Sequence, residues 1–418
     1  MGGAETALAD VLAGLREAKP SWSLELIAAS DGPLVARANT LGVMARALPF
    51  PAPLAALGEW GSRDGPRSRM RLAAGLARAA WPTRRYLRDL QTILGQRTPD
   101  IIHTNGLKMH LLGAWARPGG SALLWHVHDY VSTRALTARL LRRASGSCAM
   151  VVANSESVAA DVRRVCGNRV DVRTIWNAVD LTRFSPIGPR LDLDGLSGLP
   201  PAGDDVLRVG LIATFARWKG HRVFLRALAG LPASAAVRGY VIGGPVYDTA
   251  GSQESLADLR AEAAALGLGT RVGFSGLVPD AAPAIRALDV VVHASTDPEP
   301  FGLVIAEAMA CGKPVVVSDA GGAAELVTPG VDALTHAPGD AEALSRRIVE
   351  LAGDSALRQR IGAAGRATAE RSFARRRLAA ELVTVYQELA PERRVGLPVP
   401  RGSGNRPTSG QRGVGSPR

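Results

Sequence analysis

Short apolar runs alternate with helix-like segments along most of this chain, and this alternation strongly constrains its fold. One series of runs lies at residues 24–28, 100–104, 122–127, 149–153 and 171–175, and a second at residues 206–213, 239–243, 271–275, 289–293 and 314–318. Strands that are apolar on both faces are typical of parallel sheets covered by helices on both sides. The pattern therefore predicts an α/β protein with two doubly wound, Rossmann-like domains facing a cleft.

The boundary between the two series lies at residues 186–205, a stretch rich in Pro, Gly and Asp without a clean period. Such composition is typical of a linker. We predict five segments along the chain: an N-terminal domain over 1–185, the linker over 186–205, a C-terminal domain over 206–370, a final helix over 371–390 and a tail over 391–418. The final helix, residues 371–390, can pack back on the N-terminal domain. The tail is basic and poor in apolar residues, so we expect it to be disordered.

The formal net charge of +12 is concentrated in two places. Residues 63–88 carry a net +7 and residues 391–418 a net +5. Since the charge is not spread over a domain and no nucleic-acid-reading motif accompanies it, we predict no nucleic-acid partner. Around the first basic region, residues 69–94 combine leucines and arginines at helical spacing, interrupted by Pro82. Two interpretations stay open: a domain helix with a solvated Arg face, or an anionic-membrane surface over residues 63–94.

The compartment is predicted from what the sequence lacks. Cys148, Cys166 and Cys311 are far apart and match no zinc spacing, which suits a reducing cytosol. No apolar run is near the length of a membrane span, and the start has no signal-peptide pattern. We expect a cytoplasmic protein, peripheral at the inner face of the membrane if the basic segment binds there.

The most informative motif is EPFGLVIAE, in which Glu299 and Glu307 are separated by seven residues. It follows a strand-like run and opens a helix, so the amides of Gly302, Leu303 and Val304 lie where a helix N-terminus attracts phosphate. Glu307 is one to two turns further on, where a carboxylate can accept hydrogen bonds from ribose hydroxyls. Glu299 precedes the helix and can reach a sugar beyond the diphosphate. Two ordinary surface glutamates are the alternative, which the strand–loop–helix context disfavours.

A second motif, ATFARWKGH at residues 213–221, follows the first strand of the second series. Lys219 can place a point charge on a diphosphate, and Arg217 can add a bidentate fork. A solvated basic turn is the alternative. Asp192 and Asp194 form an Asp-x-Asp pair, which metal-dependent transferases use, but it lies in the predicted linker rather than at a strand end. We therefore predict no metal site.

Together with ARWKGH, the segment EPFGLVIAEAMACGKPVVVSDAGGAAELV resembles the C-terminal domain of family 4 retaining glycosyltransferases, which have the two-Rossmann GT-B fold. The resemblance covers about residues 1–390. The N-terminal strings that fit, in order, are GGAE (2–5), DIIHTNG (100–106), HVHDY (126–130), VVANSESVAADV (151–162) and WNAVDLTRFSP (176–186). Each string is unspecific alone, and their order carries the resemblance.

The resemblance implies roles for particular residues. The implied catalytic residues are His128, Lys219, Arg217 and Glu299. The implied donor-binding residues are Gly2, Gly3, Lys219, Val278, Phe301, Gly302, Leu303 and Glu307. The family often places its arginine closer to the strand, where Thr214 and Phe215 stand here, so Arg217 is the nearest substitute. His126 is interpreted as structural, and His103 as a further candidate for the cleft.

The implied reaction moves a sugar from a UDP-, GDP- or ADP-sugar to a glycan or lipid-linked acceptor, with retention of configuration and without a metal. No cofactor is implied, because the nucleotide sugar is a substrate. The expected setting is cell-envelope or exopolysaccharide synthesis. Two alternatives are a nucleotide-sugar epimerase on the same fold and an inactive, truncated homologue.

The start of the chain departs from the family pattern. In the family a first β-strand precedes the two glycines, whereas here Met1 precedes Gly2 and Gly3 directly. We therefore expect the N-terminal domain to lack its first strand, and the natural start to lie upstream or the chain to be a fragment.

Overall fold

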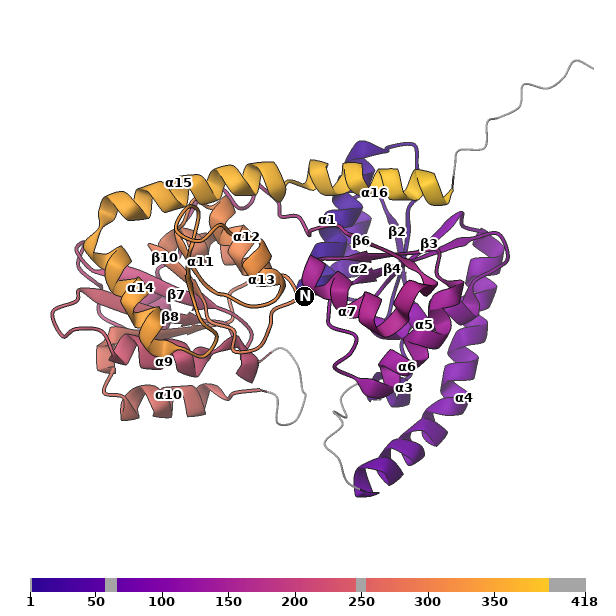
Figure 1. Ribbon diagram of the computed structural model, residues 1–418, viewed down its shortest axis with the longest axis horizontal. Helices are drawn as coiled ribbons and strands as arrows, with labels where there is room; N and C mark the ends of the chain where they lie inside the picture. Colours follow the sequence, from indigo (N-terminus) through magenta and orange to yellow (C-terminus); the bar gives the residue numbers. More distant parts are fainter. Residues whose placement is uncertain (1, 57–65, 246–252, 391–418) are drawn as a thin grey trace, which may run out of the picture.

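The computed structural model describes residues 2–56, 66–245 and 253–390, and Figure 1 shows two α/β domains side by side. The predicted disordered tail, residues 391–418, and the beginning of the basic segment, residues 63–65, lie outside the described residues. The predicted fold class is confirmed, because each domain contains a parallel sheet between helices.

The C-terminal domain contains one six-stranded parallel sheet in its described part, in the order β12-β11-β10-β7-β8-β9. Its strands are β7 (Leu207–Ile212), β8 (Val237–Ile242), β9 (Val272–Gly276), β10 (Val290–His293), β11 (Val315–Ser318) and β12 (Leu334–His336). The five predicted runs each coincide with one of the first five strands. Only β12 was not predicted, since its three residues are too few to show a period.

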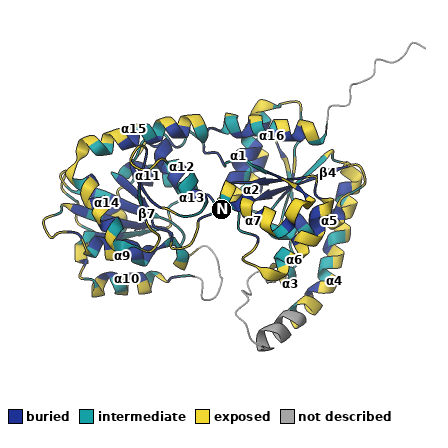
Figure 2. Cartoon of the chain, viewed as in Figure 1, coloured by how far each residue is buried: buried dark blue, intermediate teal, exposed yellow. Residues whose placement is uncertain are grey.

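Helices cover both faces of this sheet, as the alternation along β10 shows. Val290 and Val292 belong to the core under α9, α10 and α14, whereas Val291 belongs to the core under α11 and α12. The helices are α9 (His221–Ala229), α10 (Leu256–Ala265), α11 (Ala281–Ala287), α12 (Leu303–Ala310), α13 (Gly322–Glu325), α14 (Ala341–Gly353) and α15 (Ser355–Ser372). Figure 2 shows buried residues along the inner sides of these elements. A sheet buried on both faces explains why its strands are continuously apolar.

The strands of the N-terminal domain fall into two groups. Four form a parallel sheet: β3 (Ile101–Asn105), β4 (Ala122–Val127), β5 (Met150–Ala153) and β6 (Asp171–Thr174). A separate parallel pair is formed by β1 (Glu25–Ala28) and β2 (Met44–Ala47). Within the described residues, no strand pairing joins the pair to the larger sheet. The sequence did not predict β2, which is exposed or half-buried along its length and so lacks an apolar signal.

Helices cover the four-stranded sheet on both faces. Trp125 and Val151 pack under α5, α6 and α7, while Leu124 and Val152 pack under α1 and α16. The helices are α1 (Gly3–Ala18), α2 (Pro33–Thr40), α3 (Ala52–Ala56), α4 (Pro66–Arg97), α5 (Leu107–Ala116), α6 (Ala135–Ala144), α7 (Glu156–Cys166) and α16 (Arg375–Leu389). The basic segment is one helix, α4, which continues through Pro82.

The chain crosses between the domains twice, at neighbouring places. At the crossings, Val179 N–H donates to the Phe373 carbonyl at 2.9 Å. The final helix, predicted over 371–390, is α16 and begins only at Arg375, because residues 371 and 372 still belong to α15. It lies across the N-terminal domain at the top of Figure 1. There Arg375 pairs with Asp10 of α1 and, at 2.9 Å, with Asp180.

Residues 186–205, predicted as a linker, contain the short helix α8 (Leu193–Ser197). Asp192 accepts from Gly195 N–H at 2.9 Å and thereby caps this helix. Asp194 accepts from Arg238 and from the Tyr240 hydroxyl, each at 2.6 Å. The Asp-x-Asp pair therefore fastens the crossing segment to β8.

Candidate active site

A cavity of about 1030 Å³ lies between the two domains, lined by residues of both. On the C-terminal side its walls come from the loops after β7 and β10, the adjacent strands at which the order of the sheet reverses. Ligands of open α/β sheets bind at this position, outside the carboxyl ends of the strands. On the N-terminal side the walls come from the start of α1, from His128 after β4, and from α4, α5 and α6.

The loop after β7 carries Lys219 into the cavity. A short 3₁₀ turn, Arg217–Lys219, is followed by Gly220 with φ +74°. A Cβ at Gly220 would lie 1.8 Å from the Ala294 carbonyl oxygen, so only glycine lets this loop lie so close to the strand beside it. The Lys219 ammonium lies 4.0 Å from the centre of the Trp218 ring and 2.8 Å from both carboxylate oxygens of Glu299.

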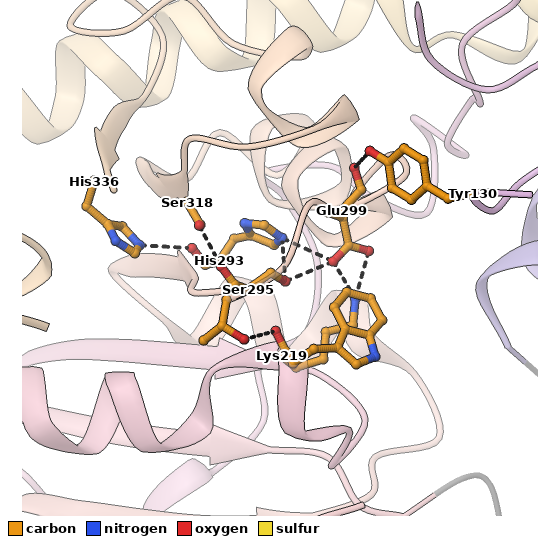
Figure 3. A network of polar contacts seen from close by, with 9 residues as sticks. Tyr130, Lys219, His293, Ser295, Glu299, Ser318 and His336 are labelled. Atoms are coloured by element: carbon orange, nitrogen blue, oxygen red, sulfur yellow. Dashed lines mark hydrogen bonds and ion pairs between the residues drawn. The ribbon is translucent and has the colours of Figure 1, made fainter. Parts of the chain in front are cut away.

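Glu299, which is only 7% exposed, is the centre of the polar network in Figure 3. The Ser295 hydroxyl donates to it at 2.9 Å, and the His293 imidazole lies 3.4 Å away. Burial alone would raise the pKa of Glu299, but the Lys219 ammonium and the His293 hydrogen bond hold that pKa well below its usual range. The carboxylate is therefore ionised and is paired with the Lys219 ammonium.

One glycine and one tyrosine fix the main chain at Glu299. Gly322 N–H donates to the Glu299 carbonyl at 2.7 Å, and the Tyr130 hydroxyl of the N-terminal domain lies 3.4 Å from the same oxygen. A Cβ at Gly322 would lie 2.0 Å from the Pro300 carbonyl oxygen. Because a larger residue does not fit there, the loop carrying Glu299 can lie directly against the turn before α13.

Two helix N-termini meet at the cavity. Gly302, with φ +89°, is the N-cap of α12 and provides no capping side chain. The start of α12 lines the cavity through Phe301, Gly302 and Leu303. Gly2 is the N-cap of α1, and a Cβ at Gly3 would lie 3.6 Å from Leu303. Unpaired N–H groups and the helix dipole attract anions at such ends. Lys219 adds a full positive charge nearby, so this wall suits a diphosphate.

His128 faces the cavity from the N-terminal domain. Its Nε2 lies 2.5 Å from the Asn105 side-chain oxygen, and its buried Nδ1 has no partner among the residues that the structure describes. Burial lowers the pKa of His128 to about 3, so the ring is neutral at ordinary pH. A neutral ring can act through hydrogen bonds but not through a full positive charge.

Two further histidines form a chain behind His128. The His126 Nδ1 lies 3.2 Å from the His103 Nε2, and the His103 Nδ1 lies 2.5 Å from the Tyr386 hydroxyl of α16. Burial lowers the pKa of His103 to about 4 and that of His126 well below its usual range. Neither ring lines the cavity, so the structure places both in the interior of the N-terminal domain.

Comparison with known proteins assigns the chain to a family. The model of Glycosyltransferase Family 4 matches residues 1–183, and the model of Glycosyl transferases group 1 matches residues 202–368. This chain belongs to the family 4 glycosyltransferases. Its structure resembles that of Anabaena Alr3699/HepE in complex with UDP and glucose, with a TM-score of 0.73 and 26% identity over 92% of this chain and 95% of that one. Sucrose-phosphate synthase of Thermosynechococcus elongatus shares the fold, with a TM-score of 0.68 and 22% identity over 90% and 91% of the two chains.

Curated relatives of this family 4 chain include two kinds of glycosyltransferase. The lipopolysaccharide core biosynthesis mannosyltransferase LpcC of Rhizobium leguminosarum bv. viciae is 34% identical over 53% of this chain and 60% of that protein. A D-inositol 3-phosphate glycosyltransferase of Rhodococcus opacus is 37% identical over 43% of this chain and 40% of that protein. The chain thus spans at most about 60% of the length of these relatives.

The cavity brings together most of the residues to which the family resemblance assigns a role. Those lining it are Gly2, Gly3, His128, Lys219, Glu299, Phe301, Gly302 and Leu303. Of the described lining residues, none is Arg217, Val278 or Glu307. Arg217 is exposed at the start of its turn, and Val278 packs against the core under α11 and α12.

Glu307 lies on the second turn of α12, beyond the residues that line the cavity. Burial raises its pKa to about 7, with the Arg183 charge lowering it and the Asp10 and Asp280 charges raising it. Of the two motif glutamates, the structure therefore places one in the cavity and the other one turn deeper.

Several residues of the site were not singled out from the sequence. Trp218, His293 and Ser295 line the cavity, and Asn105 and Tyr130 hold neighbouring groups. His293 and Ser295 end the apolar run of β10, so a polar residue at the carboxyl end of a strand was the available signal. Tyr130 follows His128 by two residues, but its contact with Glu299 crosses between domains and leaves no mark in the sequence.

Two kinds of feature are absent from residues 2–56, 66–245 and 253–390. No three His, Cys, Asp or Glu side chains in these ranges are grouped so that they could hold a metal ion. No helix in them combines the length and apolar character needed to cross a membrane.

Proposed function

We propose that this protein transfers a sugar from a nucleoside diphosphate sugar to a glycan or lipid-linked acceptor in cell-envelope or exopolysaccharide synthesis. The observation that carries the proposal is that Lys219 and the start of α12 share one cavity with His128 of the other domain. Two relatives support it. HepE has been crystallised with UDP-glucose, and LpcC is a mannosyltransferase of lipopolysaccharide core biosynthesis.

In the proposed complex, the donor diphosphate binds Lys219 and the N-terminus of α12. Lys219 then exchanges its contact with Glu299 for a phosphate, and the Glu299 carboxylate becomes free to accept hydrogen bonds from the sugar hydroxyls. Glu307 takes the ribose hydroxyls. The base is uracil, guanine or adenine, and the backbone at Val278 is the proposed contact for it.

The proposed reaction retains the configuration of the transferred hexose by displacement on one face. The bond from the anomeric carbon to the diphosphate oxygen breaks, the acceptor oxygen forms its bond on the same face, and its proton passes to the leaving diphosphate. Lys219 and the helix N-termini stabilise the charge that develops on the diphosphate. Neutral His128 hydrogen-bonds the sugar. We propose that these groups suffice without a metal and that no separate cofactor takes part.

Thermal unfolding with UDP, GDP and ADP tests the donor site. A ligand at a hundredfold excess over its dissociation constant stabilises the native state by about 2.7 kcal/mol, which is a few degrees for domains of this size. We expect one nucleotide to raise the melting temperature, and Lys219→Ala and Glu307→Ala each to reduce the rise. No shift with any of the three nucleotides would refute the proposal.

Arg217→Ala is the matched variant for this experiment, because Arg217 lies in the same turn as Lys219 but outside the cavity. A reduced shift would assign Arg217 to the phosphate, and an unchanged shift would remove it from the site. Incubation with the donor sugar and analysis of the product then separates transfer from isomerisation. Formation of an epimerised nucleotide sugar without an acceptor would favour an epimerase.

We further propose that the protein is cytoplasmic and that the outer face of α4 binds the anionic inner surface of the membrane. Trp81 is 67% exposed, and exposed Arg78, Arg85 and Arg88 lie three, four and seven residues from it, hence on one helix face. Each arginine near an anionic surface contributes about 1 kcal/mol. Co-sedimentation should occur with phosphatidylglycerol vesicles but not with phosphatidylcholine vesicles, and should weaken in high salt and in Arg85→Glu. Equal binding to both vesicles would contradict the electrostatic surface.

A further inference from the structure

The N-terminal side of the cavity is apolar over a wide area. Besides His128, it is lined by a set of side chains that we call the apolar groove: Leu76 and Ala80 of α4, Leu111 and Trp115 of α5, and Leu136 and Leu140 of α6. None of these residues has a role in the donor site. Three helices therefore converge on one surface that the proposed donor chemistry does not use.

These side chains are unusually exposed for their size. Leu76 is 44% exposed, Trp115 49%, Leu136 41% and Leu140 36%. They make up four of the eleven large hydrophobic residues that are exposed in the described part of the chain, and all four line this cavity. Scattered apolar residues on a surface need no explanation, but a convergent group beside a cavity indicates a ligand or a partner.

The rim of the groove is basic. Arg84 lies two turns beyond Leu76 on α4 and lines the same cavity, as does Arg134, which precedes α6 and pairs with Asp129 at 3.1 Å. An apolar surface beside guanidinium groups suits an amphiphile with an anionic head. The groove opens into the space that holds His128 and Glu299, so such a ligand would carry its head toward the reacting sugar.

We propose that the apolar groove binds the apolar part of the sugar acceptor, and that this acceptor is an anionic amphiphile whose reactive hydroxyl lies close to its apolar chain. The inference rests on the proposed glycosyltransferase function and narrows its acceptor from a glycan or lipid-linked molecule to an anionic amphiphile. The groove is distinct from the outer face of α4, because Trp81 does not line the cavity whereas Leu76 and Ala80 do.

The test uses alkyl phosphates as probes, kept below the concentrations at which they form micelles. Burial of each methylene contributes up to about 0.8 kcal/mol, so the dissociation constant should fall about twofold to fourfold per methylene from butyl to decyl phosphate. A dissociation constant that does not change with chain length would overturn the proposal.

Tryptophan fluorescence locates the bound chain. A terminally brominated decyl phosphate should quench Trp115, so Trp115→Phe should remove most of the quenching while Trp81→Phe leaves it. Leu140→Glu places a charge in the groove at an exposed position and should weaken binding about tenfold or more. Leu196→Glu, at a 50% exposed position of α8 outside the cavity, should leave binding unchanged. Quenching that survives Trp115→Phe but not Trp81→Phe would overturn the proposal in favour of a membrane contact.

Stabilisation by nucleotide, measured in the same samples, separates this inference from the proposed function. If a nucleotide stabilises the protein but alkyl phosphates do not bind, the groove proposal fails and the transferase proposal stands. If alkyl phosphates bind at Trp115 but no nucleotide stabilises the protein, the transferase proposal fails and with it the assignment of the ligand as an acceptor. A Trp115 emission that depends on protein concentration and not on the probes would make the groove an interface between two copies, which also overturns the proposal.

Discussion

Lys219 and Glu299 form an ion pair, although each is proposed to bind a different part of the donor. A donor must therefore separate them before either can act on it. Because the pair is buried, removing one partner leaves the other without a counter-charge, and the two removals should have opposite effects on ligand binding.

We expect Glu299→Gln to bind the free nucleoside diphosphate more tightly than the wild type, by about twofold to tenfold, because the carboxylate no longer competes for Lys219. Sugar transfer should nevertheless fall at least about a hundredfold. Lys219→Met should weaken nucleotide binding about tenfold to a hundredfold. Isothermal titration and initial rates measure both effects, and a Glu299→Gln variant that loses nucleotide affinity as Lys219→Met does would argue against competition within the pair.

The raised pKa of Glu307 predicts a dependence of stability on pH. The carboxyl group ionises near pH 4.5 in the unfolded chain and near pH 7 in the folded one, so the native state holds the extra proton between these values. Stability should therefore fall as pH rises from about 4.5 to 7, by at most about 3 kcal/mol. Glu307→Gln should match the wild type in melting temperature at pH 5 and exceed it at pH 8. A variant that is less stable at pH 8 would show that the carboxylate has a stabilising partner.

At the scale of single residues, the sequence predicted which strand ends line the cavity, but it did not predict how far along the following helix the lining extends. Lys219, Glu299 and His128 follow apolar runs, and the ends of parallel strands meet at one edge of a sheet, so their meeting could be predicted. Whether a residue on the helix after such a strand still lines the cavity depends on how far α12 is set back, as Glu307 shows. That distance is determined by packing between elements, which no local pattern encodes.

At the scale of elements, glycines decide how closely the loops of the site approach the sheet. Gly220→Ala would place a Cβ against the Ala294 carbonyl at a positive φ, so we expect a loss of about 2 kcal/mol or more of unfolding free energy and displacement of Lys219. Chemical denaturation measures the loss, and nucleotide binding reports the displacement.

Gly95→Ala is the matched control. Gly95 lies in α4, it is exposed, and a Cβ added there meets no atom within 4 Å among the described residues. Since alanine is favoured over glycine in a helix, this change should stabilise the protein by about 0.5–1 kcal/mol. If Gly220→Ala and Gly95→Ala changed the free energy of unfolding in the same direction, the close approach at Gly220 would not be what requires glycine there.

Strands with strong apolar runs could be predicted as elements, whereas weak or unpaired ones could not. Strand β2 is not buried on either face, β12 is short, and α8 lies in a stretch whose Pro and Gly suggest only a loop. Helix α8 forms because Asp192 caps it and Asp194 reaches Arg238 and Tyr240, contacts that join residues more than forty positions apart. The division of the N-terminal strands into two sheets likewise depends on which strand edges pair with one another, and local propensity does not determine this pairing.

At the scale of the whole molecule, Glu325 holds the domains together on one side of the cavity. It lies in α13 and accepts from the N–H groups of Glu156 and Ser157 at the start of α7, at 2.8 and 2.7 Å. A carboxylate at a helix N-terminus gains from both the hydrogen bonds and the helix dipole. The contact favours the arrangement of the domains seen in Figure 1.

We therefore expect Glu325→Gln to shift the protein toward an open arrangement in the absence of nucleotide. A loss of about 1–2 kcal/mol changes the ratio of open to closed forms about fivefold to thirtyfold. Small-angle X-ray scattering should show a larger radius of gyration, which a nucleoside diphosphate reverses. Glu342→Gln, at an exposed position of α14 in the same domain, is the control and should leave the radius unchanged. An unchanged radius in Glu325→Gln would show that other contacts determine the closure.

The position of α16 has a consequence for how the protein is made. Leu378, Leu382 and Tyr386 complete the core on one face of the N-terminal sheet, together with α1. During synthesis, that face stays uncovered until nearly the last described residue has left the ribosome. The described strands of the C-terminal sheet, in contrast, are complete by residue 336. The half that is translated first is therefore finished last, reversing the usual order in which domains fold on the ribosome. Until then the nascent chain carries an uncovered apolar surface, and a stalled or shortened product would present that surface to chaperones and proteases.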